Sequence, residues 1–140
     1  MMICTRFVAL VALLGCIATV DTSAQPAAPD LSRPETVVEI LIDAAQSGET
    51  RLLSHLCHPE IAPERLDPRA LQVCGMTADH PSFVPFQGMF AEMRAGGEAE
   101  VTANELLTTA RVPMVRAGDS TPVGFVNMIE HDGLWYLRGF

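Results

Sequence analysis

The sequence contains no lysine, so all nine of its basic residues are arginine. Without lysine the protein lacks the amine that forms Schiff bases and the residue with which a P-loop binds phosphates. Acidic residues outnumber the basic ones, 17 to nine, which gives a net charge of -8. A domain this acidic repels phosphate backbones, so we expect no nucleic acid as a partner.

Long apolar runs are also scarce. The clearest one, residues 7–20, is too short to span a bilayer. It follows a positive charge and precedes the small residues Thr22-Ser23-Ala24, which is typical of a signal peptide cleaved after Ala24. A second interpretation takes Leu13-Leu14-Gly15-Cys16 as a lipoprotein box with a lipid anchor at Cys16, and a third leaves the segment uncleaved. The first two predict an exported protein, periplasmic or secreted, with no membrane span.

Only two cysteines, Cys57 and Cys74, would remain after cleavage at residue 24. An even pair in an exported protein predicts a disulfide, because oxidising compartments preserve the bond. Closing the loop between Cys57 and Cys74 would stabilise the fold by about 3 kcal/mol in the chain-entropy model. We therefore expect a structural bond and not a nucleophilic Cys57.

Helical patterns fill the first half of the mature chain. Residues 25–31 are rich in alanine and proline and are expected to form a disordered tether. Ser32 and Glu35 fit a capping box, and apolar residues at helical spacing then continue to Gly48. Shorter helices are predicted at residues 50–57 and 67–75.

A third short helix is predicted from Ser82 to the pair Gly96-Gly97, with Gly88 inside it. Its apolar residues fall on one face at helical spacing: Phe83, Phe86, Phe90 and Met93.

The last twenty residues, 121–140, predict a tight β-hairpin. Two runs rich in β-branched and aromatic residues flank Asp132-Gly133, and Asp-Gly in this setting is the strongest short-range hairpin signal. Residues 110–116 predict a strand before it, in which Pro113 requires an edge position or a bulge. Residues 98–109 hold one further strand at most. Residues 32–140 are thus expected to form a single α+β domain, with N-terminal helices on a curved C-terminal antiparallel meander.

The two-residue turn fixes which residues of the hairpin share a face. It pairs Glu130 with Trp135, Met128 with Leu137 and Val126 with Gly139, and we assign the Trp135 face to the helices. The opposite face is apolar as well, so it predicts a homodimer interface. The residues of this interface are Phe125, Ile129, Tyr136, Arg138 and Phe140. In the alternative interpretation the tether or a loop folds over the same face.

The order of these elements resembles the nuclear-transport-factor-2-like superfamily, in particular its small secreted bacterial members of unknown function. The features that carry the resemblance are the leader, a first helix ending in Gly48-Glu49, a helical segment with Leu53 and Cys57, an aromatic third helix, and the final Asp132-Gly133-Leu134-Trp135-Tyr136-Leu137. The resemblance implies a cone-shaped fold with an open pocket. Because the superfamily includes isomerases, dehydratases, cyclases and binding modules, it does not decide the function.

Aromatic and methionine side chains are the candidates to line such a pocket: Phe86, Met89, Phe90, Met128 and Trp135. Arg111, expected on the same face as Val126, would anchor an acidic ligand group. A stripe of this kind is more often part of the hydrophobic core. The two interpretations are therefore plain core and an apolar ligand pocket. We predict a non-catalytic binding or interaction module for an apolar small molecule or peptide, without a cofactor.

The alternative function is a small acid-base enzyme of the isomerase or dehydratase type. Enzymes of this superfamily abstract protons with a pocket carboxylate or histidine, and Asp79 and His80 are the nearest candidates. This hypothesis requires both side chains inside the cone beside Trp135. In the alternative interpretation, Asp79 only forms a turn and His80 is exposed, so neither has a catalytic role.

Histidines also cluster near Cys57. His55 and His58, with Cys57 and His80, have the donor types of a zinc or copper site. A thiol engaged in a disulfide is not a ligand, however, so we expect solvated histidines and predict no metal.

Overall fold

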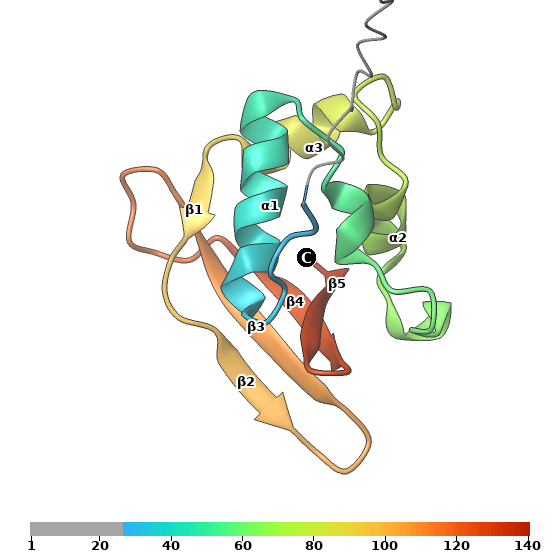
Figure 1. The fold of residues 1–140 in the computed structure, drawn as a ribbon. Helices are drawn as coiled ribbons and strands as arrows, with labels where there is room; N and C mark the ends of the chain where they lie inside the picture. The colour runs from blue at the N-terminus through green and yellow to red at the C-terminus, as the bar shows by residue number, and fades with distance from the viewer. Residues whose placement is uncertain (1–26) are drawn as a thin grey trace, which may run out of the picture.

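The computed structural model describes residues 27–140, so the predictions about the leader and its cleavage lie outside the described residues. The described part is an α+β domain in which three α-helices and two 3₁₀ helices precede a curled antiparallel sheet (Figure 1). The predicted fold class is therefore confirmed. No helix in the described range is long and apolar enough to cross a membrane.

Helix α1 (Pro34–Ser47) lies in front of the sheet and buries its apolar side against it (Figure 1). Gly48 ends the helix as predicted, with a left-handed φ of 76°. The predicted cap was wrong: Arg33 occupies the N-cap position, and the Glu35 carboxylate accepts a hydrogen bond from the Ala99 amide at 3.1 Å. Proline is favoured at the first helical position, so Pro34 starts the helix one residue later than a Ser32 cap would require.

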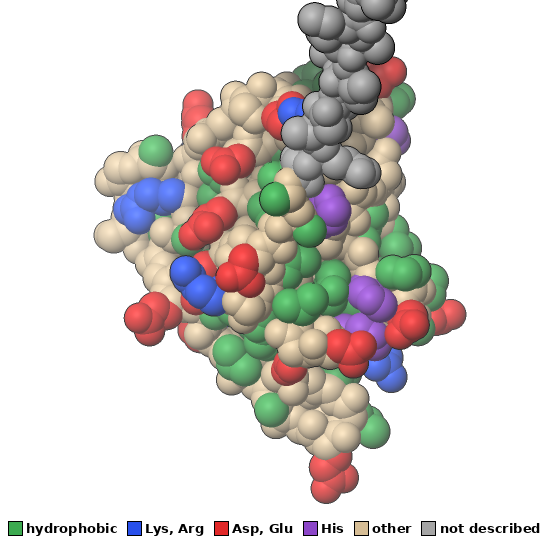
Figure 2. Space-filling view, viewed as in Figure 1, with side chains coloured by type: hydrophobic (Ala, Val, Ile, Leu, Met, Phe, Trp, Pro, Cys, Tyr) green, Lys and Arg blue, Asp and Glu red, His purple; other side chains and the backbone are tan. Residues whose placement is uncertain are grey.

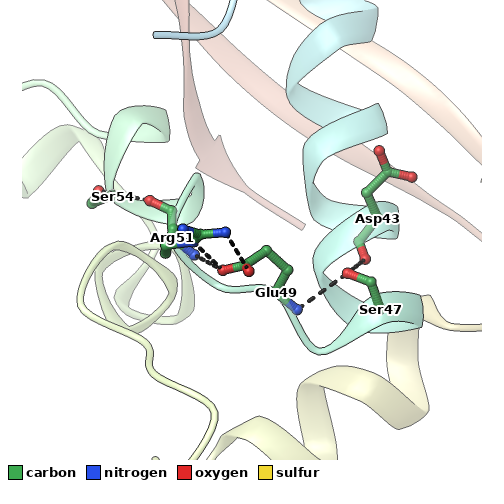
Figure 3. A network of polar contacts seen from close by, with 5 residues as sticks. All are labelled: Asp43, Ser47, Glu49, Arg51 and Ser54. Carbon is green, nitrogen blue, oxygen red and sulfur yellow. Dashed lines mark hydrogen bonds and ion pairs between the residues drawn. The ribbon is translucent and has the colours of Figure 1, made fainter. Parts of the chain in front are cut away.

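A chain of polar contacts leads from α1 into the 3₁₀ helix η1 (Leu53–Leu56), as Figure 3 shows. The Ser47 hydroxyl donates to the Asp43 carbonyl at 2.6 Å and accepts from the Glu49 amide at 3.1 Å. The Glu49 carboxylate then accepts two bonds of 2.8 Å from the Arg51 guanidinium. These bonds lower the pKa of Glu49 and raise that of Arg51. The helix predicted at residues 50–57 is thus a single 3₁₀ turn that follows this bend.

The predicted disulfide joins Cys57, directly after η1, to Cys74, the last residue of α2 (Pro68–Cys74). Their Cα atoms are 5.8 Å apart. Asp67 caps α2 as predicted, because its carboxylate accepts a hydrogen bond from the Arg69 amide at 2.8 Å. A short 3₁₀ helix, η2 (Pro63–Arg65), lies between the two cysteines and was not predicted.

Helix α3 (Phe83–Phe90) buries its three phenylalanines on one face, as expected. It ends well before the predicted Gly96-Gly97 stop, since Met93 already belongs to strand β1 (Met93–Ala95). Gly96 has a different role. A Cβ at this position would lie 2.6 Å from Cγ1 of Val115, so glycine allows the chain to cross β3 closely.

Strand β3 (Thr108–Arg116) is at the centre of the sheet, with β4 on one side and both β1 and β2 (Glu100–Ala103) on the other. The pairing is irregular at Pro113, as predicted, but the interruption lies in the neighbouring strands and β3 itself is neither an edge strand nor bulged there. Residues 96–99 connect β1 to β2 opposite this proline, and the Gly96 amide donates to the Pro113 carbonyl at 2.7 Å. The missing N–H of Pro113 thus faces an interruption between two strands, where no ladder bond is lost.

Strands β4 (Gly124–His131) and β5 (Leu134–Gly139) form the predicted hairpin. Asp132 and Gly133 have φ values of 52° and 78°, as a type I′ turn requires. The predicted pairs of Glu130 with Trp135 and of Met128 with Leu137 are confirmed.

The register shifts nearer the C-terminus. Asn127 lies opposite Gly139, so Arg138 is the extra residue of a β-bulge and the predicted pair of Val126 with Gly139 was wrong. The start of α2 docks here: the Asp67 amide donates to the Arg138 carbonyl at 2.8 Å. A Cβ at residue 139 would lie 2.9 Å from Cβ of Asp67, so glycine is needed for this approach.

The core lies between the helices and one face of the sheet. Alternate strand residues point into it and are buried: Ala110, Val112, Met114, Val126, Met128 and Leu137. Trp135 is 7% exposed, and its amide donates to the Leu31 carbonyl at 2.8 Å. Leu31, the last residue of the expected tether, is itself 5% exposed, so the ordered domain begins at least there.

Candidate functional site

Two adjacent cavities open between the helices and the C-terminal end of the sheet. The first, of about 290 Å³, lies between α2 and α3. Val73 and Met76 line it from the side of α2, Phe86 and Met89 from α3, and the terminal residue Phe140 closes one end. The second, of about 180 Å³, lies between α3 and strand β4 and shares Met89 and Phe140 with the first. These two residues therefore stand between the cavities.

Methionine recurs in the lining of both cavities, with two of the nine lining residues in the first and three of nine in the second. Of the five methionines among the described residues, four contribute to it: Met76, Met89, Met93 and Met114. Met76 and Met114 are buried as well, at 5% and 4% exposed, whereas Met89 is 39% exposed and Met93 is half-buried. The fifth, Met128, is fully buried in the core and lines neither cavity. Methionine is flexible and polarizable, so it adapts to differently shaped apolar partners and is frequent at binding surfaces that accept several of them. We call these four side chains, together with Phe140, the methionine-lined opening.

One charged side chain, that of the exposed Arg69, contributes to the lining of the first cavity, and no charged side chain lines the second. Among the residues that the structure describes, no acceptor takes a hydrogen bond from the Arg69 guanidinium and no carboxylate pairs with it. The opening thus combines an apolar interior with a single positive charge at the surface.

Half of the predicted pocket residues lie at these cavities, namely Phe86, Met89 and Phe90. Met128 and Trp135 are core residues that line neither cavity, and Phe86 and Phe90 belong to the buried core as well. Arg111 was placed on the wrong face, because Val112 and not Arg111 pairs with Val126. Arg111 is exposed, forms a 2.6 Å ion pair with Glu100 and lies 4.7 Å above the ring of Phe125.

Asp79 and His80, the residues of the enzyme hypothesis, lie on the loop between α2 and α3 and line neither cavity. Asp79 accepts a 2.6 Å bond from the Thr77 hydroxyl, which lowers its pKa. Nδ1 of His80 accepts a bond from the Ser82 amide at 3.0 Å. Each side chain thus has a local partner in a turn, and the two do not converge inside the fold beside Trp135, which that hypothesis requires.

The predicted dimer face is largely covered from within the chain. Ile129 and Tyr136 are 3% and 7% exposed. The ring of His58, in the loop after the disulfide, packs edge-on against the ring of Tyr136 at 5.0 Å. This loop fits the alternative in which a loop folds over the face. Burial raises the pKa of Tyr136, and the charge of Asp132 adds to the effect.

The bulge at Arg138 moves Phe140 away from the predicted dimer face. The Phe140 ring packs against Phe90 of α3 at 5.2 Å, on the side of the helices. Phe125 and Arg138 stay half-buried, and Phe125 lies beside Arg111 and also contributes to the lining of the second cavity.

The sequence analysis missed one group of potential ligands, which we call the histidine cluster: His58, Glu60 and His131. The metal set considered from the sequence is not assembled, because Cys57 is in the disulfide and His55 is exposed on η1. The sequence analysis did not consider His131 as a ligand. The approach of His131 to His58 depends on tertiary packing, so no local spacing in the sequence indicates it.

Comparisons with family models, with curated proteins and with solved structures gave no match. The α+β fold class is the one that the resemblance to the nuclear-transport-factor-2-like superfamily implies. Membership of that superfamily stays a prediction.

Proposed function

We propose that the protein is a non-catalytic binding module and that its methionine-lined opening receives apolar side chains of a peptide or protein segment. The observation that carries this proposal is the concentration of four methionines on two adjacent open cavities. Methionine at this density suits a partner whose side chains vary.

The size of the cavities favours side chains over a whole ligand. At about 290 Å³ the first cavity is at the lower end of the roughly 300–1,000 Å³ of ordinary ligand pockets, and at about 180 Å³ the second is smaller. Two hollows on either side of Met89 and Phe140 fit two apolar side chains of one segment. Arg69 at the edge can pair with an acidic group of the same segment. Burying such groups would supply most of the affinity through the hydrophobic effect.

The proposal includes export to an oxidising compartment, and the disulfide is compatible with it. The superfamily resemblance supports the binding function, since binding modules occur in that superfamily. A homodimer over Phe125 and Arg138 remains a separate proposal, because the other residues of that face are covered or turned to the helices. The enzyme hypothesis has no comparable support, because Asp79 and His80 line neither cavity.

Two substitutions on α3 test the proposal. Met89 lines both cavities and is 39% exposed, whereas Val84 lines neither and is 74% exposed. A labelled peptide selected from a random display library against the wild type should lose at least about tenfold in affinity with Met89→Glu, since a charge at the opening must be desolvated when an apolar group binds. Val84→Glu is the matched control and should bind as the wild type does.

Fluorescence anisotropy of the labelled peptide gives the affinities. Equal affinities for the two variants would refute the proposed opening. A different result is a library that yields no binder, while dodecanoate binds the wild type and Met89→Glu weakens that binding. This result would identify the ligand as a small apolar acid and not a peptide.

A further inference from the structure

We propose that the histidine cluster, His58, Glu60 and His131, is a binding site for a divalent transition-metal ion such as Zn²⁺. This inference is independent of the binding function above, because none of the three residues lines either cavity of the methionine-lined opening. It revises the sequence prediction of solvated histidines and no metal.

The distances within the cluster are close to those of a coordination shell. One potential ligand atom from each of the three residues lies within 4.8 Å of the others. Nε2 of His131 is 3.2 Å from Oε2 of Glu60 and 3.6 Å from Oδ2 of Asp132. In a tetrahedral zinc site with bonds of about 2.0–2.1 Å, neighbouring ligand atoms are about 3.3 Å apart. Movements of an exposed glutamate and a half-buried imidazole are therefore enough to close the shell.

The two imidazoles come from segments that the fold holds in place. His58 follows Cys57 of the disulfide, and its ring packs against Tyr136. His131 is the last residue of β4, opposite Leu134 in the hairpin. The two ring centroids are 4.4 Å apart. Figure 2 shows two histidine side chains lying together with acidic side chains beside them, near the hairpin end of β4 and β5.

The donor types select the kind of ion. Imidazole nitrogen with carboxylate oxygen suits Zn²⁺, Cu²⁺ and Ni²⁺, whereas Ca²⁺ and Mg²⁺ prefer shells made of oxygen alone. Two histidines and one glutamate leave a fourth position for water or for the carboxylate of Asp132, which is 87% exposed and free to move. The net charge of -8 also raises the local concentration of cations around the protein.

One existing contact competes with metal binding. Nδ1 of His58 accepts a hydrogen bond from the Glu60 amide at 3.2 Å. A metal at Nδ1 replaces this bond directly, and a metal at Nε2 requires a proton on Nδ1, which breaks it as well. The exchange gives up a long bond for a metal-nitrogen bond, so it does not prevent the site from forming.

The four histidines of the chain provide their own controls, since His55 and His80 lie outside the cluster. The experiment is isothermal titration calorimetry of ZnCl₂ into the protein expressed from residues 1–140, without a histidine tag or chelator and with the disulfide intact. We expect one Zn²⁺ per chain. His58→Gln and His131→Gln should each weaken binding at least about tenfold, since even outer-shell partners of a ligand are worth 10–100-fold. His55→Gln and His80→Gln should bind Zn²⁺ as the wild type does.

A spectroscopic readout keeps the test independent of folding defects. Electron paramagnetic resonance of the Cu²⁺-loaded protein should show coupling to two imidazole nitrogens, and to one in either cluster variant. Circular dichroism identifies a variant that fails to fold, and His58→Gln, in a loop outside the helices and strands, then decides alone. Absence of Zn²⁺ binding by the wild type, or equal losses in cluster and control variants, would overturn the proposal.

Discussion

The disulfide between Cys57 and Cys74 should account for a large share of the stability of the domain. We consider the double variant Cys57→Ala/Cys74→Ala, which removes the bond and leaves no free thiol in the described part of the chain. The bonded residues are 17 positions apart. In the chain-entropy model a loop of that length restricts the unfolded chain by about 10 cal/mol/K, which is about 3 kcal/mol at 25 °C. Domains of this size are stable by only about 5–15 kcal/mol.

Trp135 provides the assay. It is the only tryptophan of the chain and is 7% exposed, so its fluorescence reports global unfolding in urea. The double variant should lose about 3 kcal/mol of unfolding free energy relative to the oxidised wild type. The wild type treated with reductant is the control and should show the same loss.

A loss below about 1 kcal/mol in both samples would refute this reasoning. It would mean that the unfolded chain already keeps η1 and α2 close together, or that strain in the folded state cancels the entropic gain. A large loss in the variant alone would instead point to the packing of the substituted side chains.

Two further predictions concern an alkaline titration and a close backbone contact. Burial raises the pKa of Tyr136 above the ordinary value of 10.0. The unfolding free energy should therefore be undiminished below about pH 10 and fall as the pH rises through the folded-state pKa. The variant Tyr136→Phe should not show this loss. No lysine and no other tyrosine titrates in that range, so urea midpoints across pH measure this group alone. Gly139→Ala should lower the unfolding free energy by about 1–3 kcal/mol, because its Cβ would meet Asp67 at 2.9 Å. Gly88→Ala, with open space around it in α3, should instead be neutral or stabilising by up to about 1 kcal/mol; equal effects of the two alanines would contradict the contact.

Features set by short stretches of sequence could be predicted well. Asp132-Gly133 determines its own turn, because only few residues tolerate two successive positive φ values. The cap at Asp67 and the stop at Gly48 are local in the same sense. The disulfide followed from counting the cysteines of a chain that the sequence predicts to be exported.

Features that depend on contacts between distant segments could not be predicted. The bulge at Arg138 exists where Asp67 docks on β5, which no pattern within the hairpin indicates. Pro113 is tolerated because a connection between two other strands passes beside it.

The candidate site divides in the same way. Phe86, Met89 and Phe90 could be assigned to one region by helical spacing, but Phe140 reaches it only because of the bulge. The approach of His58 to His131 likewise depends on how the disulfide-bonded loop packs on the hairpin.

The most direct test of the binding function uses the methionines themselves. With ¹³C-labelled methionine methyl groups, nuclear magnetic resonance follows each of the five methionines of the domain during titration with the selected peptide. We predict that the signals of Met76, Met89, Met93 and Met114 shift together, while that of the fully buried Met128 stays in place. Saturating binding that leaves the four signals unmoved, or that shifts Met128 as much as the others, would contradict the account.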